Sequence, residues 1–387
     1  MPTTKPVVVY GASGYTGRLT CEYLREYNIP FVAAGRDAGR LEEAMKLIPG
    51  IETADYEVAA VEHTVEALTD LFSGAKVVLN MVGPFSKLGP ETVEAALAAG
   101  CHYTDTTGEQ DWVMVCDETY GERFADAGLL LAPGVAQMYT TGEIAANIAL
   151  ETPGLDTLDI LVLWKGFPTV ASTATIFENL LSPRYYLEQN TYQPWTVEPH
   201  EVVVPGQHEL ALALEWGGTS HPVWFKRDPR VANVKALGGL FDRARMQAVI
   251  EGAGEVAAKA AEMSPDEAKA FLAQVAAQTQ SEMPPRENQR INISLDSVYA
   301  SGPAGKVHVV LNGTCNYKQT GLMQAYAAHA LIHGSTRRAG FASGCQAFGH
   351  RELLGVLRAF GLMAEPTISG HVSPVAVSAP ASSYGRI

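Results

Sequence analysis

Three glycines stand at regular spacing directly after a run of valines near the start of the chain. The segment reads VVVYGASGYTGRL, with Gly11, Gly14 and Gly17 inside it. A strand, a glycine-rich turn and a helix in this order are typical of dinucleotide-binding folds. Gly11 permits a tight turn, Gly14 lets the backbone approach a pyrophosphate, and Gly17 lets the helix pack close to the strand. Because N–H groups at a helix start favour phosphates, the sequence predicts a dinucleotide site.

The residues after the second strand distinguish the two pyridine dinucleotides. The strand FVAAG ends at Gly35, and Arg36 follows. NAD-specific folds place an acidic residue here, about 20 residues after the glycine loop, whereas a guanidinium pairs with a 2′-phosphate. Asp37 precedes LEEAMKLI and is better explained as a helix cap. The sequence therefore favours NADP(H), and Arg40 is either a second phosphate contact or a solvated surface residue.

A Gly-Pro turn follows the strand KVVLNMV, where ligands of open parallel sheets lie. We expect this turn to run beside the ribose and nicotinamide of the cofactor, although a plain strand-ending turn has the same pattern. A third element ends near residues 53–55. The cofactor site is therefore assigned these further residues: Asp55, Asn80, Val82, Gly83, Pro84 and Phe85.

Two carboxylates end the strand CHYTDTT near the same crevice. Asp105 and Glu109 either orient a substrate and shuttle a proton or cap the helix that begins near Asp111. Both interpretations remain open, and Asp105 is carried forward as a catalytic candidate.

Hydride transfer also needs a group that neutralises the negative charge that grows on the substrate. We consider Tyr139, Lys165 and Ser172, which follow strand ends or loops in the middle of the chain. Each has a structural alternative. Tyr139 could pack its ring in the core, Lys165 could be solvated at a strand end, and Ser172 could cap the helix that follows it.

The elements that must position these residues alternate between strand and helix up to about residue 133. Parallel pairing, right-handed crossovers and a doubly wound Rossmann-type α/β sheet follow from this alternation. The expected strands are 7–10, 31–35, 76–82, 101–107 and 129–134, and the expected helices include 17–27, 91–100 and 111–127.

The pattern changes after residue 135. Short strands, among them HPVWFKR at 221–227, alternate with a helix at 171–181 and an Ala-rich helical stretch at 241–280. Within this stretch, Ser264-Pro265-Asp266-Glu267 forms a helix start. A hairpin is expected over 290–317, then helices at 320–333 and 350–361, and an irregular tail at 371–387. We predict a second, α+β domain whose sheet is largely antiparallel.

Composition restricts the classes of partner. The net charge of −14 repels nucleic acid and anionic membranes. No apolar run reaches the roughly 18 residues of a membrane helix. The five cysteines are scattered without a Cys-x-x-Cys pair, so we expect a reducing cytoplasm. No metal is expected, because His329 and His333 have helical spacing but no recognisable third ligand.

The chain resembles the saccharopine dehydrogenase-like superfamily, above all its branch of trans-acting enoyl reductases. The stretches that carry the resemblance are GASGYTGRL, AAGRD, LNMVGPFSKLGPETVEAALAAGCHYTDTTGE, NYKQTG and GFASGCQAFGHRELLGVLRAFGL, spread over nearly the whole chain. The third is the most specific, because a Gly-Pro-aromatic turn and an Asp-x-x-Gly-Glu strand end rarely occur together.

The resemblance implies a split Rossmann domain, with residues 330–387 returning to residues 1–133, and a substrate and dimerisation domain at 134–329. It implies NADP(H) at Gly11, Ser13, Gly14, Tyr15, Thr16, Arg36 and the Gly83-Pro84-Phe85 turn, and a homodimer. The family often has a Ser-Gly-Gly-Thr-like loop where this chain has Lys165-Gly-Phe-Pro-Thr169. That departure puts the family's substrate in doubt here.

We therefore expect an NADPH-dependent reductase of a conjugated C=C bond in a mainly apolar carbonyl compound. Saccharopine-type C=N or C=O chemistry is the alternative, and a non-catalytic NADP(H)-binding redox sensor is the second. Arginines are sparse in the middle block before Arg227, which disfavours a substrate with several carboxylates. Aromatic residues that would favour an apolar cleft are Phe167, Phe177, Tyr185, Tyr186, Trp195, Trp216 and Trp224, unless they are core residues.

Overall fold

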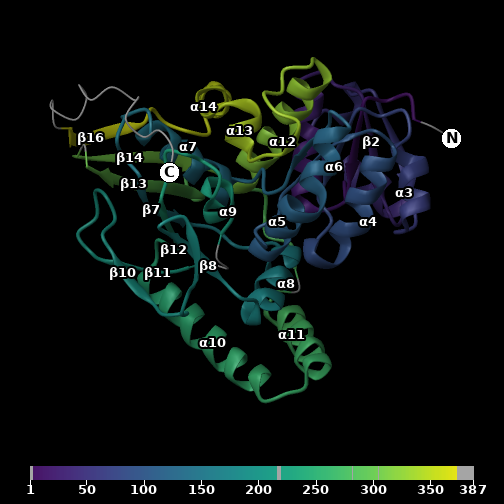
Figure 1. Ribbon diagram of the computed structural model, residues 1–387. Helices are drawn as coiled ribbons and strands as arrows, with labels where there is room; N and C mark the ends of the chain where they lie inside the picture. Colours follow the sequence, from purple (N-terminus) through teal and green to yellow (C-terminus); the bar gives the residue numbers. More distant parts are fainter. Residues whose placement is uncertain (1–2, 216–218, 281, 304, 373–387) are drawn as a thin grey trace.

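The computed structural model describes residues 3–215, 219–280, 282–303 and 305–372. Two β-sheets lie next to each other, each with its own helices (Figure 1). The N-terminal third, coloured purple to blue, forms the right-hand part of the view, and the second sheet forms the left-hand part. The candidate site lies where the two parts meet.

The first sheet has seven strands, all of them parallel. Its order is β15-β6-β5-β4-β1-β2-β3, so the order reverses between β1 and β4. The central strands β1 and β4 are buried on both faces, which explains their continuous apolar runs. The strands are β1 (Val7–Tyr10), β2 (Phe31–Gly35), β3 (Tyr56–Ala60), β4 (Val77–Asn80), β5 (His102–Asp105), β6 (Leu130–Ala132) and β15 (Gly340–Phe341).

Helices cover both faces of this sheet. One face packs against α1, α2 and α12, and the other against α3, α4 and α5. This arrangement confirms the predicted doubly wound α/β fold. The helices are α1 (Tyr15–Glu26), α2 (Ala38–Lys46), α3 (Val65–Phe72), α4 (Phe85–Ala98), α5 (Gln110–Val115), α6 (Gly121–Asp126) and α12 (Asn316–Ile332).

The second sheet is mixed, with one parallel pair, β7 and β12, among antiparallel neighbours. Its order is β10-β11-β12-β7-β13-β14-β16, and the β8–β9 hairpin joins it beside β12. A largely antiparallel second sheet is therefore confirmed. Its strands are β7 (Thr157–Trp164), β8 (Tyr185–Glu188), β9 (Thr191–Pro194), β10 (His200–Val202), β11 (Ala211–Leu214), β12 (Asn233–Leu240), β13 (Ile293–Gly302), β14 (Gly305–Thr314) and β16 (Thr367–Val372).

The helices of the second part lie around this sheet. α7 packs on β7, β13 and β14, while α10 and α11 form a hairpin that projects from the body (Figure 1). Ser264 and Glu267 form the capping box predicted at the start of α11. The helices are α7 (Gln137–Ala149), α8 (Val170–Glu178), α9 (His221–Phe225), α10 (Arg243–Ala261), α11 (Pro265–Thr279), α13 (Gly344–Phe348) and α14 (His350–Ala359).

One predicted strand is wrong, and two elements lie in unexpected places. HPVWFKR forms the short helix α9, because Pro222 sits in its first turn, where a missing N–H costs nothing. Helix α12 packs against α1 of the first part, and β16 pairs with β14 of the second. The boundaries at 133/134 and 329/330 stay a prediction. The rest of the predicted irregular tail, 373–387, lies outside the described residues.

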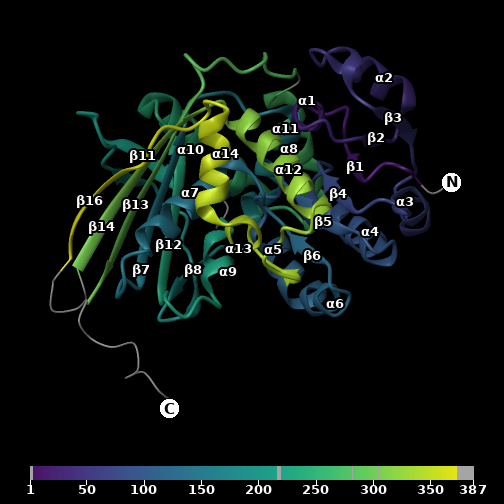
Figure 2. The same cartoon turned by 90° about the horizontal axis from the view of Figure 1, so that it is seen from above.

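Helix α12 joins the two parts, as Figure 2 shows from above. It crosses α1 closely at Gly321, where a Cβ atom would stand 2.9 Å from the backbone carbon of Leu19. The Gln324 amide donates to the carbonyls of Asp105 and Val135, at 2.8 Å each. These contacts fix the first half of α12 relative to the carboxyl edge of the first sheet.

A buried carboxyl group makes stability depend on pH. Glu143 of α7 accepts hydrogen bonds from the Ser343 hydroxyl and, at 3.1 Å, from the Cys345 N–H. Burial raises the pKa of Glu143 to about 7 from 4.5. The folded protein therefore retains a proton that the unfolded chain loses, and stability falls as pH rises from about 4.5 through about 7.

We predict that Glu143→Gln removes this loss. The wild-type free energy of unfolding should fall by about 3 kcal/mol more than that of the variant between pH 4.5 and pH 8. Urea unfolding at the two pH values measures the difference, and Glu118→Gln, which changes an exposed carboxylate, is the control. Parallel pH profiles for wild type and Glu143→Gln would contradict the assignment.

Candidate functional site

The glycine loop has the tight geometry that its spacing predicts. Gly11 has φ +91°, and a Cβ atom there would stand 2.8 Å from Cγ2 of Val82. A Cβ atom on Gly17 would stand 2.8 Å from Cα of Ala12. Any larger side chain at either position would push the loop away from β1 and β4.

The loop leaves the start of α1 open to an anion. Gly14 is the residue before α1 and provides no side-chain cap for its first N–H groups. Ser13 is half-buried beside it, and Thr16 faces the cleft between the two parts. Free N–H groups at the end of a helix of this length favour phosphate.

Arg36 is exposed directly after β2, next to Gly35. Tyr10 lies nearby and shares a 2.8 Å hydrogen bond with Nδ1 of His63. Burial raises the pKa of Tyr10, and the positive charge of Arg36 opposes that rise. Within the described ranges no ion pair engages Arg36. The side chain of Asp37 accepts a 2.9 Å hydrogen bond from the Arg40 N–H, which confirms it as a helix cap.

Asp55 does not lie with these residues, which corrects its assignment to the cofactor site. The strand β3 begins after Asp55 instead of ending there, and its register pairs Phe31, the first residue of β2, with Tyr56. Since parallel strands share their direction, Asp55 lies at the edge opposite to Gly35. Its carboxylate forms an ion pair with Lys5 instead.

The Asn80–Phe85 turn is fixed from inside the protein. The buried Asn80 amide donates to the Tyr103 hydroxyl at 2.9 Å and accepts from the Val82 N–H at 2.9 Å. Glu109 accepts from the Phe85 and Ser86 N–H groups, at 2.7 Å each. Glu109 therefore caps a helix, one of the two roles considered for it. The helix that it caps is α4 and not the one that begins near Asp111. The Gly83 backbone is left facing the cleft.

Asp105 is fully buried and is a structural acceptor, which corrects its place among the catalytic candidates. It accepts from the N–H groups of Thr107 and Gly134, at 3.0 and 2.8 Å. It also accepts from the Trp112 indole and the Tyr103 hydroxyl, at 3.1 and 3.0 Å. Four donors occupy its oxygens, so none of its lone pairs is left for a substrate.

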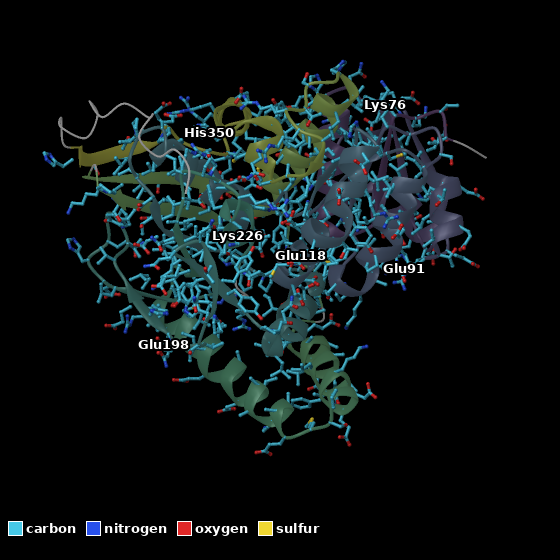
Figure 3. The ribbon with its side chains drawn as sticks, in the orientation of Figure 1. Lys76, Glu91, Glu118, Glu198, Lys226 and His350 are labelled. Carbon is cyan, nitrogen blue, oxygen red and sulfur yellow. The ribbon has the colours of Figure 1, made fainter. Side chains whose placement is uncertain are left out.

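A cleft of about 180 Å³ separates the carboxyl edge of the first sheet from the second part. None of the described residues that line it carries a charge, in contrast to the exposed Lys76, Glu118 and Glu198 on the outside (Figure 3). The cleft is lined by Thr16, Met81, Gly83, Phe85, Thr106, Gly108, Ala136, Gln137, Met138, Tyr139, Trp164, Pro168, Thr169, Ala171, Ser172, Thr175, Ile176, Asn316, Tyr317 and Thr320.

The structure separates the three protic candidates. Tyr139 and Ser172 line the cleft, but Lys165 does not. Because side chains alternate at the end of β7, Trp164 faces the cleft and Lys165 lies in another hollow beside Glu209 and Arg243. Burial raises the pKa of Tyr139, whose ring packs against Val113, Val223 and Trp224.

The helix-cap alternative for Ser172 is wrong, because helix α8 is capped by Thr169. The Ser172 hydroxyl instead contacts that of Tyr317, at 3.0 Å, a residue that sequence reasoning missed. Tyr317 lies in NYKQTG, a stretch that carried the resemblance, and no local pattern marks its hydroxyl as functional.

Several polar atoms beside the cleft have no hydrogen-bond partner among the described residues. They are Nε1 of Trp164, Oε1 of Gln137, and both Oδ1 and Nδ2 of Asn316. Buried polar atoms are normally paired, so unpaired ones beside a cleft mark places where a ligand or water gains a hydrogen bond. The set offers neutral donors and acceptors.

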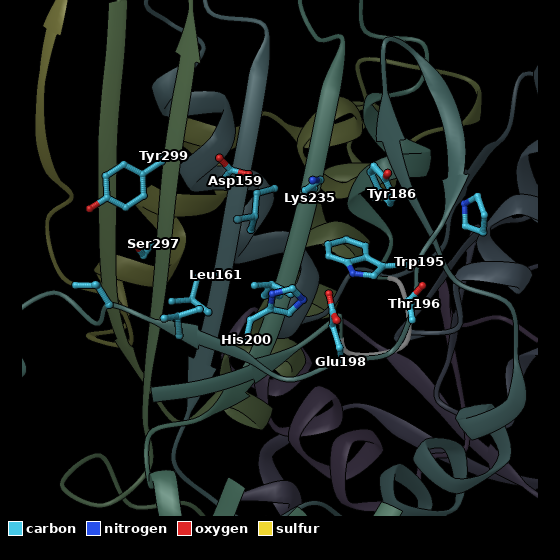
Figure 4. Close-up of a pocket in the computed structure, with 15 residues that line it drawn as sticks. Asp159, Leu161, Tyr186, Trp195, Thr196, Glu198, His200, Lys235, Ser297 and Tyr299 are labelled. Carbon is cyan, nitrogen blue, oxygen red and sulfur yellow. The ribbon is translucent and has the colours of Figure 1, made fainter. Parts of the chain in front are cut away.

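The aromatic residues named from sequence do not form this cleft. None of those in the described ranges lines it, and Trp216 lies outside them. Tyr186 and Trp195 instead line a hollow of about 550 Å³ on the outer face of the second sheet (Figure 4). That hollow also contains Asp159 and Lys235. It belongs to a different face from the glycine loop and cannot receive the nicotinamide end of a dinucleotide bound there.

Two family models match the chain. Residues 7–128 match the saccharopine dehydrogenase NADP-binding domain, and residues 140–372 match a family of unknown function, DUF5938. The solved structure of apo saccharopine dehydrogenase (L-Glu forming) from Saccharomyces cerevisiae superimposes with a TM-score of 0.60 over 94% of this chain and 100% of that one. At 10% identity this likeness concerns the fold alone.

Curated relatives match one segment only. A trans-acting enoyl reductase from Mycobacterium tuberculosis is 34% identical over 136 residues, which is 33% of this chain and 32% of the relative. A lipid droplet localized protein from Caenorhabditis elegans is 33% identical over 131 residues, 32% of this chain and 31% of the relative. The matched segment thus spans about a third of each of these curated relatives.

The residues present fit NADP(H). Gly11 and Gly17 have no room for a side chain, and the bare backbone at Gly14 allows a pyrophosphate to approach the loop. Arg36 is exposed directly after β2, at the same edge of the sheet as the glycine loop, and its guanidinium has the chemistry that a 2′-phosphate needs. The Gly83 turn lies at the same carboxyl edge of the sheet, and the neutral cleft extends from there to the second part.

We predict that Arg36→Ala weakens NADPH binding selectively, because the guanidinium can pair with the 2′-phosphate. The Kd for NADPH should rise at least tenfold, about 1.4 kcal/mol, and the Kd for NADH less than threefold. Nucleotide fluorescence titration measures both. Lys46→Ala removes a cation from the far end of α2 and is the control. Equal losses for the two nucleotides would remove the basis for NADP specificity.

Proposed function

We infer that this chain, which belongs to the DUF5938 family of unknown function and carries a saccharopine dehydrogenase NADP-binding domain, reduces a conjugated C=C bond in a neutral, mainly apolar carbonyl compound with NADPH. The observation that carries the inference is the cleft beside the dinucleotide edge, whose described lining has no charged side chain. The similarity to a trans-acting enoyl reductase supports the same chemistry.

The alternative of saccharopine-type chemistry requires a site for several carboxylates. Burying a carboxylate without a cation costs several kcal/mol, so such a site needs lysine or arginine. The polar groups that the cleft offers are instead hydroxyls, amides and an indole, such as those of Ser172, Asn316 and Trp164. These groups suit a neutral carbonyl.

When bound, NADPH would supply a hydride to the substrate. The chain's own contributions are to hold the nucleotide at the glycine loop, to orient the substrate in the cleft and to exclude water. Met81, Phe85 and Ile176 give the cleft its apolar surface. The buried Glu109 keeps the Gly83 turn in place through the two backbone N–H groups that it binds.

The non-catalytic sensor remains an outcome of the same test. A sensor needs the nucleotide site but no second cleft. The cleft here takes residues from both parts of the chain, among them Thr16 and Trp164, which supports a substrate site. A protein that binds NADPH and oxidises it with no unsaturated carbonyl would favour the sensor.

We predict a strong preference for uncharged substrates. In NADPH oxidation assays with matched α,β-unsaturated esters and carboxylates, kcat/KM should be at least ~100-fold higher for the ester, because the carboxylate must be buried without a partner. Ile176→Lys, at the rim of the cleft, should reduce the ratio of kcat/KM between ester and carboxylate, because the lysine can pair with the carboxylate. Val249→Lys, on the exposed side of α10, should not. Equal turnover of the two compounds by the wild type would contradict the proposal.

We also propose a homodimer formed through the outer face of the second sheet. Tyr299 and Val203 are exposed residues that line the hollow on this face, with 49% and 66% of their surface accessible. Asp159 and Lys235 are register partners there (Figure 4). A two-fold axis can therefore pair Asp159 of one chain with Lys235 of the other.

Light scattering tests the dimer. The wild type should have twice the mass of one chain, and Tyr299→Glu should lower it toward that of a single chain, because an interface charge without a partner is costly. Leu47→Glu, at an exposed apolar position on the other sheet's helix layer, should leave the mass unchanged. A monomeric wild type would contradict the interface.

We propose a cytoplasmic location, which the five free and buried cysteines support. Within the described part of the chain, no helix has both the length and the apolar character needed to cross a bilayer.

A further inference from the structure

We propose that Tyr317 is the proton donor of the reduction. The hydroxyls of Ser172 and Thr169 orient its phenol group by hydrogen bonds and return a proton to it after each turnover. This inference rests on the proposed reductase function. Tyr317 is the second residue of α12 and lines the neutral cleft together with Ser172 and Thr169 of the α8 region. The three hydroxyl groups come from segments about 150 residues apart in the sequence.

The oxygen of Tyr317 receives support from two directions. The backbone N–H of Thr169 donates to it at 3.0 Å, and the Ser172 hydroxyl lies 3.0 Å away. Ser172 is in turn 2.9 Å from the Thr169 hydroxyl and donates its N–H to that oxygen at 3.1 Å. The groups form a short hydrogen-bonded chain that ends at the phenol.

The Ser172 hydroxyl can donate either to Thr169 or to Tyr317, and one of these arrangements leaves the Tyr317 proton for the cleft. A phenol oxygen accepts two hydrogen bonds and donates one. When the Thr169 N–H and the Ser172 O–H both donate to Tyr317, its own proton is left for an acceptor in the cleft. Two donors on the oxygen also stabilise the phenolate that forms when the proton leaves.

Tyr317 is held in place from its other sides as well. The carboxylate of Glu287 accepts from the N–H groups of Tyr317 and Lys318, at 3.1 and 2.9 Å, and so fixes the start of α12. The ring of Tyr15 meets the ring of Tyr317 edge to face, with centroids 5.2 Å apart. Tyr15 belongs to the glycine loop, so the nucleotide site and the phenol share one packing contact.

Tyr15 itself is engaged by the segment that precedes α12. Its hydroxyl donates to the Pro285 carbonyl at 2.8 Å and accepts from the Glu287 N–H at 3.1 Å. We therefore assign Tyr15 a positioning role toward Tyr317. The cofactor contact that the resemblance implies for Tyr15 stays a prediction, and since its side chain points to the second part, its backbone would make that contact.

The chemical step balances as follows. A bound NADPH would supply the hydride that the β-carbon of the substrate gains, and would itself become NADP⁺, so that the C=C bond becomes a C–C single bond. The displaced electron pair moves toward the carbonyl oxygen as an enolate. The Tyr317 O–H bond breaks and its proton goes to the enolate oxygen. The enol then gains a proton at the α-carbon and loses the one on oxygen to solvent, and the phenolate regains a proton from solvent through Ser172.

Tyr139 is the rival donor, because its hydroxyl also lies at the cleft, beside Gly108. No hydrogen bond to the Tyr139 hydroxyl occurs among the described residues, and its ring belongs to the apolar cluster around Trp224. A phenolate at Tyr139 would lack the donors that Tyr317 has. The geometry therefore favours Tyr317.

The test compares single-turnover NADPH oxidation, with a neutral enone, in the wild type and Tyr317→Phe. The rate of the variant should fall ~100- to 1,000-fold, as expected for loss of a general acid, while the Kd for NADPH changes less than twofold. The wild type should show a solvent deuterium isotope effect that Tyr317→Phe lacks. The single-turnover rate of Ser172→Ala should fall ~10-fold. Tyr326→Phe, on the same helix but away from the cleft, should retain the wild-type rate.

Two results would overturn the assignment: a Tyr317→Phe rate within threefold of wild type, or a larger loss in Tyr139→Phe than in Tyr317→Phe. Failure of the reductase function itself looks different, because the wild type would then bind NADPH without oxidising it. In that case enone binding decides. A bound enone should absorb at longer wavelength in the wild type than in Tyr317→Phe if the phenol donates to its carbonyl, and an unchanged spectrum would refute the contact.

Discussion

The architecture depends on the close approach of the glycine loop to the two strands beside it. Gly11 and Gly17 leave no space for a side chain against Val82 and Ala12, so α1 starts directly at the end of β1. Helix α1 then supports α12, which crosses it at Gly321. Helix α12 in turn brings Asn316 and Tyr317 to the cleft. Substitution at one of these glycines would therefore displace both the nucleotide loop and the residues that face the substrate.

Charge is distributed in a way that serves the same arrangement. The chain carries a net charge of −14, yet the carboxylates nearest to the cleft are used inside the protein. Asp105, Glu109 and Glu287 each accept backbone N–H groups and thereby fix a turn or a helix start. Burial raises the pKa of all three, and the hydrogen bonds oppose that rise. The cleft itself is left with neutral donors and acceptors.

Local patterns in the sequence were sufficient for the first half of the fold. The strand–turn–helix spacing, which acts over a few residues and needs no tertiary context, was enough to single out Gly11, Gly14, Gly17 and Arg36 as candidate cofactor residues. The same reasoning failed for Asp55. The predicted third element ends at this residue, whereas β3 begins after it, so Asp55 lies at the opposite edge of the sheet. It also failed for Lys165, because strand alternation, which the sequence did not locate to a single residue, decides between two faces.

The substrate cleft was beyond reach for a different reason. Ser172 and Tyr317 meet only because β14 leads into a helix that returns to the first sheet, and no local pattern contains that return. Asp105 is a different case: three of its four donors, Tyr103, Thr107 and Trp112, lie within seven residues of it, and only the Gly134 N–H comes from another segment. A buried acceptor and a catalytic acid look alike in sequence, and only the partners distinguish them.

Isothermal titration calorimetry of the full chain with NADPH and with NADH tests the central claim most directly. The account predicts saturable binding of NADPH at one site per chain, with a Kd at least tenfold lower than that for NADH, which is about 1.4 kcal/mol. Absence of binding heat for both nucleotides, with neither of them protecting the chain against thermal unfolding, would contradict it.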